Sequence, residues 1–525
     1  MDILTFIYVF GCFVVMIPFT YEWFLLFQQE HYSARKILNS LKYRYFKNKA
    51  VYAIYIATFW ALLVALNLST YVYLGTVVCF LWAIYLIPKA VVPLKITPRL
   101  IRLTVTYTLL VISVALVLLQ EGVYLGFSLS LLILPFLMLL ANFLNYPVEQ
   151  AIRIFYLRKA QKKLSKMRHL IKFGITGSFG KTSTKNILTQ LLSDSFLVAA
   201  TPKSFNTPLG IALTINKMLP GYSEVFIAEM GAFRLKEIKY LADFVKPQIA
   251  VITDIGPQHL STFKTVDNIV KAKTEILENT FPPLFGIVNA DSAYLRDYLK
   301  EKTALKTELL WVGIENKEAD IYASDIQISG KETSFDLYIG GKKEGVINTK
   351  LLGRHNVYNI LFGVAGIIAL QNLGYDLVIT DICEKIKNLK PIEHRLEYQK
   401  WGNWDVYNDS YNANIQGFIN GLEVLKKFDL KKAVITPGIV DAGKEMAALN
   451  TLVARELLTD INWVLLIDNQ ASRIIEGYFL ENNFTEYLKF ASFSQALGYL
   501  KENYSDEQIC LLIENDLPDH FLIRK

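Results

Sequence analysis

Long apolar runs fill the first 150 residues, whereas short apolar runs separated by polar residues make up the rest of the chain. Five long runs lie at roughly 3–25, 50–68, 72–88, 103–119 and 123–143, each near the ~20 residues that a helix needs to cross a bilayer. The first run starts at Asp2, without a basic residue or a small-residue cleavage site, which argues against a cleavable signal peptide. The pattern predicts an α-helical membrane domain of about five spans over residues 1–150.

Basic residues distinguish the two sides of this predicted domain. The loops after the first, third and fifth spans are rich in Lys and Arg, whereas the turns at 67–70 and 120–122 have neither. By the positive-inside rule, the N-terminus lies outside and everything after residue 145 is cytoplasmic, as expected for a multi-pass protein of the bacterial inner membrane. Charged residues are nearly absent from the spans, which argues against a transport pathway. An anchor and a docking site for a lipid-linked substrate are equally compatible with this pattern.

Composition adds two exclusions. The net charge of +7 comes largely from residues at the predicted membrane edges, where anionic lipid headgroups lie, so nucleic acid is not expected as a partner. The four cysteines are Cys12, Cys79, Cys383 and Cys510, and no spacing pairs them. A disulfide scaffold and a cysteine metal site are therefore not expected.

The rest of the chain reads as a basic linker helix at 151–169 and two α/β domains, at 170–396 and 397–525. Apolar runs at 223–229, 248–254 and 284–289, separated by helical patterns, predict buried parallel strands. Residues 305–350 alternate apolar and polar positions around glycines, which predicts antiparallel strands and a hairpin. Further strands at 404–407, 433–436 and 463–467 predict a second, Rossmann-like domain of about 130 residues.

The most informative motif is a glycine turn between a predicted strand and a predicted helix. Residues 174–184 read Gly-Ile-Thr-Gly-Ser-Phe-Gly-Lys-Thr-Ser-Thr, directly after an apolar run. Such a P-loop points backbone N–H groups and a helix N-terminus at the phosphates of a nucleotide. Lys181 can reach the outer phosphates and Thr182 can hold Mg²⁺, although Ile175 stands where the common Walker pattern has its first glycine.

Acidic and imidazole groups follow the next predicted strands. Glu229 and Asp254 end two of them, and His259 follows shortly after. Carboxylates and an imidazole beside a phosphate loop are typical of a divalent cation that bridges the nucleotide and a second substrate. Each alone is more often structural, but the three together favour a metal site.

Five later residues give weaker signals when each is taken alone. Lys273 lies in a basic helical run that is usually a solvated face. Asn356 can cap a helix, and Asn359 one turn later can join it in reading a purine edge. Arg395 can clamp phosphate, and Asp409 can bind ribose hydroxyls or begin a helix.

Taken in order, these motifs resemble the Mur ligase family over about residues 170–525. Besides the glycine turn, the resemblance rests on Glu-Met-Gly-Ala at 229–232, His259 with Ala-Lys-Thr-Glu at 272–275, Gly-Arg-His-Asn-Val-Tyr-Asn at 353–359, His-Arg at 394–395, and Asp-Ser-Tyr-Asn-Ala-Asn at 409–414. The chain is most similar to the type that adds D-alanyl-D-alanine to the muramoyl tripeptide.

The resemblance implies ATP and Mg²⁺ as cofactors and assigns roles to individual residues. It implies catalytic roles for Lys181, Lys273, His259 and Glu229. It implies ATP contacts for Gly177, Ser178, Gly180, Lys181, Thr182, Ser183, Asn356, Asn359, Arg395 and Asp409. It implies metal binding by Thr182, Glu229, His259 and a carbamylated Lys273, and substrate contacts for Asn206, Tyr411, Asn412 and Asn414.

The implied reaction is amide-bond formation through an acyl phosphate, with release of ADP and phosphate. Two departures affect the substrates. The predicted membrane domain replaces the family's UDP-sugar-binding domain, so the expected acceptor is a lipid-linked or membrane-proximal carboxylate. Residues 436–444 differ from the family's loop at that place, which leaves the identity of the amine open.

The sequence therefore predicts a membrane-anchored, ATP-dependent amide ligase. It would join an amino acid or short peptide to a carboxylate of a cell-envelope glycan or lipid-linked precursor, alongside membrane partners of envelope biosynthesis. A polymerising ligase of the poly-γ-glutamate type and a non-catalytic ATP-binding scaffold are the alternatives. A transporter ATPase is disfavoured because a second nucleotide motif is missing.

Overall fold

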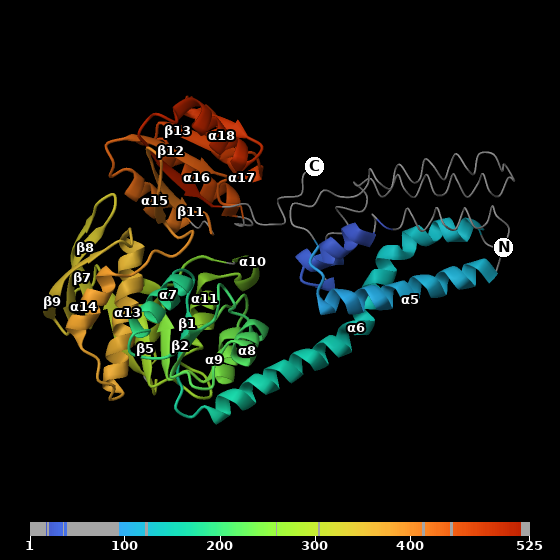
Figure 1. Cartoon of the computed structure of the whole chain (residues 1–525), viewed down its shortest axis with the longest axis horizontal. Helices are drawn as coiled ribbons and strands as arrows, with labels where there is room; N and C mark the ends of the chain where they lie inside the picture. Colours follow the sequence, from blue (N-terminus) through green and yellow to red (C-terminus); the bar gives the residue numbers. More distant parts are fainter. Residues whose placement is uncertain are drawn as a thin grey trace. The chain divides into compact units, whose positions relative to one another are not determined.

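The structure is a computed structural model that describes residues 17, 20–34, 36–38, 94–120, 124–258, 260–302, 305–411, 415–440 and 445–515. Within these ranges, residues 118–120, 124–132, 261 and 380 are described by their backbone alone. The chain divides into two compact units (Figure 1). One comprises Met1–Ile154 with Leu517–Lys525, and the other comprises Phe155–Asp516.

The first unit contains helix α5 (Pro98–Gln120) and most of helix α6 (Tyr124–Lys166). Among the described residues, one helical stretch, Pro98–Val117, is long and apolar enough to cross a membrane. It covers the fourth predicted span. The predicted spans at 50–68 and 72–88, and most of the first, lie outside the described residues. The structure therefore does not show the five-span domain.

Helix α6 differs from the prediction. Residues 124–166 form one continuous helix, so the fifth predicted span and the predicted linker at 151–169 are not separate elements. Pro147 lies inside this helix and does not end it. The last turns belong to the second unit, where Leu157, Ala160 and Leu164 are buried in its core.

The larger sheet of the second unit has nine strands in the order β2-β3-β1-β4-β5-β6-β7-β8-β9. Pairing is parallel as far as β7 and antiparallel between β7, β8 and β9, as the change of pattern after residue 305 predicts. The strands are β1 (Ile171–Thr176), β2 (Val198–Ala200), β3 (Val225–Glu229), β4 (Ile249–Ile252), β5 (Phe285–Asn289), β6 (Glu308–Gly313), β7 (Ile321–Ile328), β8 (Thr333–Ile339) and β9 (Lys342–Thr349).

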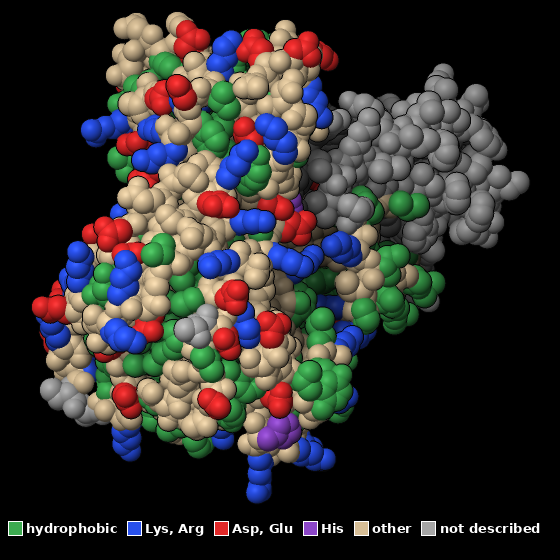
Figure 2. Space-filling model, turned by 60° about the vertical axis from the view of Figure 1, so that its left-hand side comes forward, with side chains coloured by type: hydrophobic (Ala, Val, Ile, Leu, Met, Phe, Trp, Pro, Cys, Tyr) green, Lys and Arg blue, Asp and Glu red, His purple; other side chains and the backbone are tan. Residues whose placement is uncertain are grey.

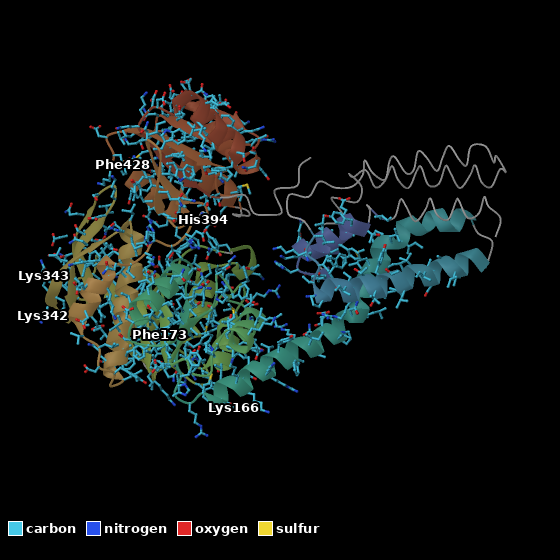
Figure 3. All side chains as sticks on the ribbon, in the orientation of Figure 1. Lys166, Phe173, Lys342, Lys343, His394 and Phe428 are labelled. Atoms are coloured by element: carbon cyan, nitrogen blue, oxygen red, sulfur yellow. The ribbon has the colours of Figure 1, made fainter. Side chains whose placement is uncertain are left out.

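Helices cover both faces of this sheet. The helices are α7 (Lys181–Leu192), α8 (Pro208–Lys217), α9 (Glu237–Val245), α10 (Leu260–Phe263), α11 (Val266–Thr274), α12 (Ala293–Lys300), α13 (Arg354–Asn372) and α14 (Ile379–Lys387). Apolar residues of α7, α13 and α14 form one core with Phe173 and its neighbours (Figure 3). Those of α8, α9, α11, α12 and the end of α6 form the core on the opposite face. Because the strands are buried on both faces, their sequences are continuously apolar.

The second sheet has six strands in the order β10-β11-β15-β12-β13-β14, all parallel except β10. Its elements are β10 (Glu397–Trp401), β11 (Trp404–Asp409), α15 (Ile415–Leu425), β12 (Lys431–Thr436), α16 (Met446–Leu457), β13 (Trp463–Ile467), α17 (Gln470–Glu481), β14 (Tyr487–Phe490), α18 (Phe493–Tyr504) and β15 (Ile509–Glu514). The three predicted strands of this domain are confirmed as β11, β12 and β13. The strands β11 and β12 flank the last strand, β15, so the carboxyl ends of all three meet at one edge.

Charged side chains are interspersed over the face that Figure 2 shows, with acidic and basic groups close together. Surface ion pairs of the described residues include Lys431 with Glu507 at 2.7 Å and Lys302 with Glu278 at 3.1 Å. Such exposed pairs contribute little to stability because solvent screens them.

Candidate active site

The glycine turn lies between β1 and α7, as the sequence predicts, and two positions in it accept only glycine. Gly177 has a φ of 148°, and an added Cβ would lie 2.1 Å from Thr253 Oγ1. Gly180 has a φ of 78°, and its Cβ would lie 2.8 Å from Asn359 Oδ1. Ser178 ties the turn to the end of β4 because its N–H donates to Asp254 O at 2.7 Å. The turn therefore presents the α7 N-terminus, a favourable place for phosphate.

Lys181 begins α7 and folds back over this turn. Its Nζ donates to the carbonyls of Gly177 at 2.7 Å and Ser178 at 2.9 Å. Burial lowers the pKa of Lys181 to about 8, with Glu229 raising it and Arg395 lowering it. The ammonium group thus occupies the place where the outer phosphates of a bound nucleotide are expected.

Glu229, at the end of β3, is the centre of a buried cluster. Its Oε2 accepts from Thr182 Oγ1 at 2.9 Å and from Lys185 Nζ at 3.1 Å, and its Oε1 accepts from Asn206 Nδ2 at 3.1 Å. Asn206, which the resemblance assigns to substrate, holds this carboxylate in place. Lys185 is not among the predicted site residues, although it lies four residues after Lys181 and thus on the same helix face.

The other predicted ligands are less clearly arranged. Lys273 is buried in α11, and burial, followed by repulsion from Lys181, lowers its pKa to about 7. His259 lies outside the described residues. Burial raises the pKa of Asp254 to about 6, and its Oδ1 accepts from Ile255 N at 2.7 Å. In the described part of the chain no three His, Cys, Asp or Glu side chains converge. The predicted cluster of Glu229, Asp254 and His259 stays a prediction because it includes His259.

Two asparagines hold α13 against the glycine-turn helix. Of the two interpretations of Asn356, the cap of α13 does not hold: the cap is Gly353, whose φ of 87° suits glycine. Asn356 Nδ2 donates to Leu352 O at 2.9 Å, and Asn359 Nδ2 donates to Asn356 Oδ1 at 3.2 Å. Asn359 Oδ1 in turn accepts from Thr184 Oγ1 at 3.0 Å. Both amides are buried beside the turn, and their adenine contacts stay a prediction.

Arg395 lies where the chain passes from the first sheet to the second, next to His394 (Figure 3). His394 and Leu396 both have left-handed φ values, of 59° and 47°, which are strained for these residues. The Arg395 guanidinium carbon lies 4.3 Å from the centre of the Tyr411 ring, and the Tyr411 hydroxyl donates to Ser204 Oγ at 3.0 Å. Asn412 and Asn414 lie outside the described residues, and Ser183 is buried in α7.

Two carboxyls lie side by side at the ends of β11 and β15, where Asp409 is in register with Glu514. Burial raises the pKa of Asp409 to about 6, while Arg395 and the N–H of Leu396 lower it. Glu514 is fully buried, and neither of its carboxyl oxygens has a hydrogen-bond partner. Burial and then Asp409 raise its pKa well above the usual range. Glu514 is not among the predicted site residues, although an acidic residue at the end of the apolar run of β15 is a usable signal.

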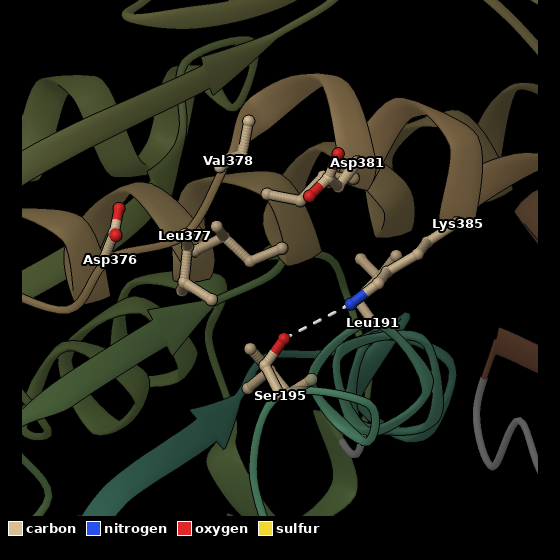
Figure 4. A pocket seen from close by; sticks show the side chains of 10 residues that line it. Leu191, Ser195, Asp376, Leu377, Val378, Asp381 and Lys385 are labelled. Atoms are coloured by element: carbon tan, nitrogen blue, oxygen red, sulfur yellow. Dashed lines mark hydrogen bonds between the residues drawn. The ribbon is translucent and has the colours of Figure 1, made fainter.

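A separate small pocket lies at the opposite end of α7 (Figure 4). It is lined by Leu191, Asp381 and Lys385 among others, and Lys385 Nζ donates to Ser195 Oγ at 3.3 Å. Because a helix rises about 1.5 Å per residue, this pocket is on the order of 15 Å from the glycine turn. It is not part of the cluster around Lys181.

Comparison with known proteins agrees with this geometry. Residues 175–367 match the model of the Mur ligase middle domain. The UDP-N-acetylmuramoyl-tripeptide–D-alanyl-D-alanine ligase of Escherichia coli (strain K12) is 26% identical over 303 residues, which are 57% of this chain and 65% of that one. The ligase of the same description from Rickettsia prowazekii is 30% identical over 263 residues, 50% of this chain and 57% of its own. The chain thus spans about 65% or less of the length of these curated relatives.

Solved structures show the same fold. MurF from Acinetobacter baumannii covers 69% of this chain and 77% of its own, with a TM-score of 0.60 and 23% identity. MurF ligase from Thermotoga maritima, solved in complex with ADP, covers 69% and 80%, with a TM-score of 0.60 and 21% identity. At these identities the likeness establishes the fold alone. Residues 175–367 are therefore similar to a Mur ligase middle domain, and the α/β part of the chain has the fold of these solved ligases.

Proposed function

We propose that the chain is an ATP-dependent ligase that joins an amine to a carboxylate through an acyl phosphate, releasing ADP and phosphate. The observation that supports this proposal best is the arrangement of Lys181, Thr182 and Glu229 around one glycine turn. Lys181 supplies a half-buried positive charge at the turn, and the Thr182 hydroxyl and the Glu229 carboxylate meet at 2.9 Å beside it. Fixed charges of this kind favour phosphoryl transfer because they stabilise the negative charge of the transition state.

The residues fit a magnesium ion. Oxygen donors from a hydroxyl and a carboxylate are the ligands that Mg²⁺ prefers, and Thr182 and Glu229 would hold it. When bound, the ion would offset phosphate charge during transfer. Lys181 would orient the terminal phosphates, Arg395 would balance charge at the domain junction, and the buried Lys273 has the lowered pKa that carbamylation requires.

For the two substrates, we propose an acceptor carboxylate on a lipid-linked or membrane-proximal envelope precursor, and an amino acid or short peptide as the amine. The support is α5, where apolar side chains at helical spacing are exposed: Ile101, Val105, Leu109, Ile112 and Leu116 are 43% to 61% exposed. Such a stripe is costly in water and favourable in lipid. The proposed location is the cytoplasmic membrane of a bacterium, with the two α/β domains on the cytoplasmic side.

The experiment is a screen for amine-stimulated ADP formation. The full chain in detergent receives Mg-ATP, a membrane lipid extract or UDP-linked muramoyl peptides as acceptor, and a panel of amino acids and dipeptides. We expect ADP release that requires both an acceptor and an amine, and that is lost in Lys181→Met. Product length separates a single addition from polymerisation. Failure of every combination, in protein that still binds ADP, would favour the scaffold alternative.

A further inference from the structure

The Glu229 carboxylate is already paired with a positively charged side chain, that of Lys185. The Glu229 side chain is 1% exposed, and so is that of Lys185, whose Nζ lies 3.1 Å from Glu229 Oε2. Lys185 also donates to the carbonyl of Lys203, which fixes its ammonium group at this position. The same Oε2 accepts from Thr182 Oγ1. The Lys185 ammonium group is therefore bound to Glu229, the carboxylate that would hold the metal ion in the proposed function.

Separating Lys185 from Glu229 is energetically unfavourable. Removing one partner of a buried ion pair leaves the other charge without compensation, which is strongly unfavourable. The Lys185 side chain has little freedom to move because it is buried and its Nζ has two hydrogen-bond acceptors. Glu229 is equally restricted, since Thr182 and Asn206 hold its two oxygens. The lysine charge therefore remains next to any divalent cation that approaches Glu229.

We propose that Lys185 is a positioning residue that makes metal binding at Glu229 depend on the nucleotide. Without phosphates, a divalent cation meets one carboxylate that Lys185 has already neutralised, together with the positive charge of Lys181. With a bound nucleotide, the phosphates supply the missing negative charge, and the cation binds between them and Glu229. This inference rests on the proposed function for the location of the metal, and it adds the order of binding.

The test measures Mn²⁺ binding by electron paramagnetic resonance of the free ion, with and without ADP. Three forms of the full chain are compared: the wild type, Lys185→Met, and Lys432→Met as the control. Lys432 is a matched control because it is 6% exposed and pairs with Asp460 at 3.0 Å in the other α/β domain. Without ADP we expect Lys185→Met to bind one Mn²⁺ at least tenfold more tightly than the wild type and the control. The double variant Lys185→Met with Glu229→Gln should lose this site.

Equal Mn²⁺ affinity without ADP in Lys185→Met and in the wild type would overturn the inference. If Lys185→Met is less stable than the wild type, the change in its melting temperature on adding Mn²⁺ is measured instead. Because a ligand that binds the folded state raises the melting temperature, we expect MnCl₂ at about 1 mM to raise that of Lys185→Met without nucleotide. The control should show no such rise. A melt of Lys185→Met that Mn²⁺ does not change would also overturn the inference. The proposed function fails separately, if the wild type binds no ADP with Mn²⁺ present.

Discussion

The buried carboxyl of Glu514 gives a sharp prediction about stability. The change Glu514→Gln keeps the shape of the side chain and removes its charge. The raised pKa of Glu514 means that the folded state binds this proton more tightly than the unfolded state does. Its contribution to stability is therefore complete below the unfolded pKa of about 4.5 and is lost as pH rises through the folded pKa. Glutamine does not titrate, so its contribution to stability does not change with pH. The free energy of unfolding of Glu514→Gln therefore rises relative to that of the wild type as pH rises.

The size of this stability change follows from the lack of hydrogen-bond partners for the Glu514 carboxyl oxygens. A buried polar group without a hydrogen bond costs about 1–3 kcal/mol, and more when charged, so we expect a gain of about 1–2 kcal/mol at pH 8. For the unit Phe155–Asp516, with an unfolding entropy of about 2.1 cal/mol/K per residue, that is a rise in melting temperature of about 1–3 °C. Thermal melts of the full chain at pH 5 and pH 8 measure it, with the exposed Glu423→Gln on α15 as the matched control. A lower melting temperature for Glu514→Gln at pH 8, or an equal shift at both pH values, would refute the reasoning.

Three further predictions concern the nucleotide site. Lys181→Met should weaken ADP binding at least about tenfold, since its charge lies within the glycine turn, and calorimetry measures this; unchanged affinity would contradict the assigned role. Gly177→Ala places a Cβ 2.1 Å from Thr253 Oγ1 at a φ of 148°, so it should cost about 1–3 kcal/mol of stability and weaken ADP binding, whereas Gly477→Ala, where nothing lies within 4 Å, serves as the control. Because burial lowers the pKa of Lys273 to about 7, its amine is mostly neutral at pH 8; ¹³C-bicarbonate should then give a carbamate resonance that is absent in Lys273→Arg and that fades below pH 7.

The sequence predicted the parts of the fold that local patterns determine. Continuous apolar runs identified β3, β4 and β5, and the glycine spacing located the turn before α7, because these features depend on neighbouring residues. Long-range contacts were harder to predict. That Asn206 holds Glu229, or that Asn359 lies against Gly180, depends on residues more than twenty positions apart. Asparagine is a common capping residue, so the sequence left the cap of α13 open between two interpretations of Asn356, whereas Gly353 with its positive φ is the cap.

The continuity of α6 determines where this chain can be cut. A fragment that starts at residue 170, at the edge of β1, would lose the turns that carry Leu157, Ala160 and Leu164 and would uncover the apolar faces they protect. It would also free two backbone carbonyls, of Ile215 and Leu219, that accept from Lys163. Expression of the catalytic half alone should therefore begin near residue 151, and a shorter version should aggregate.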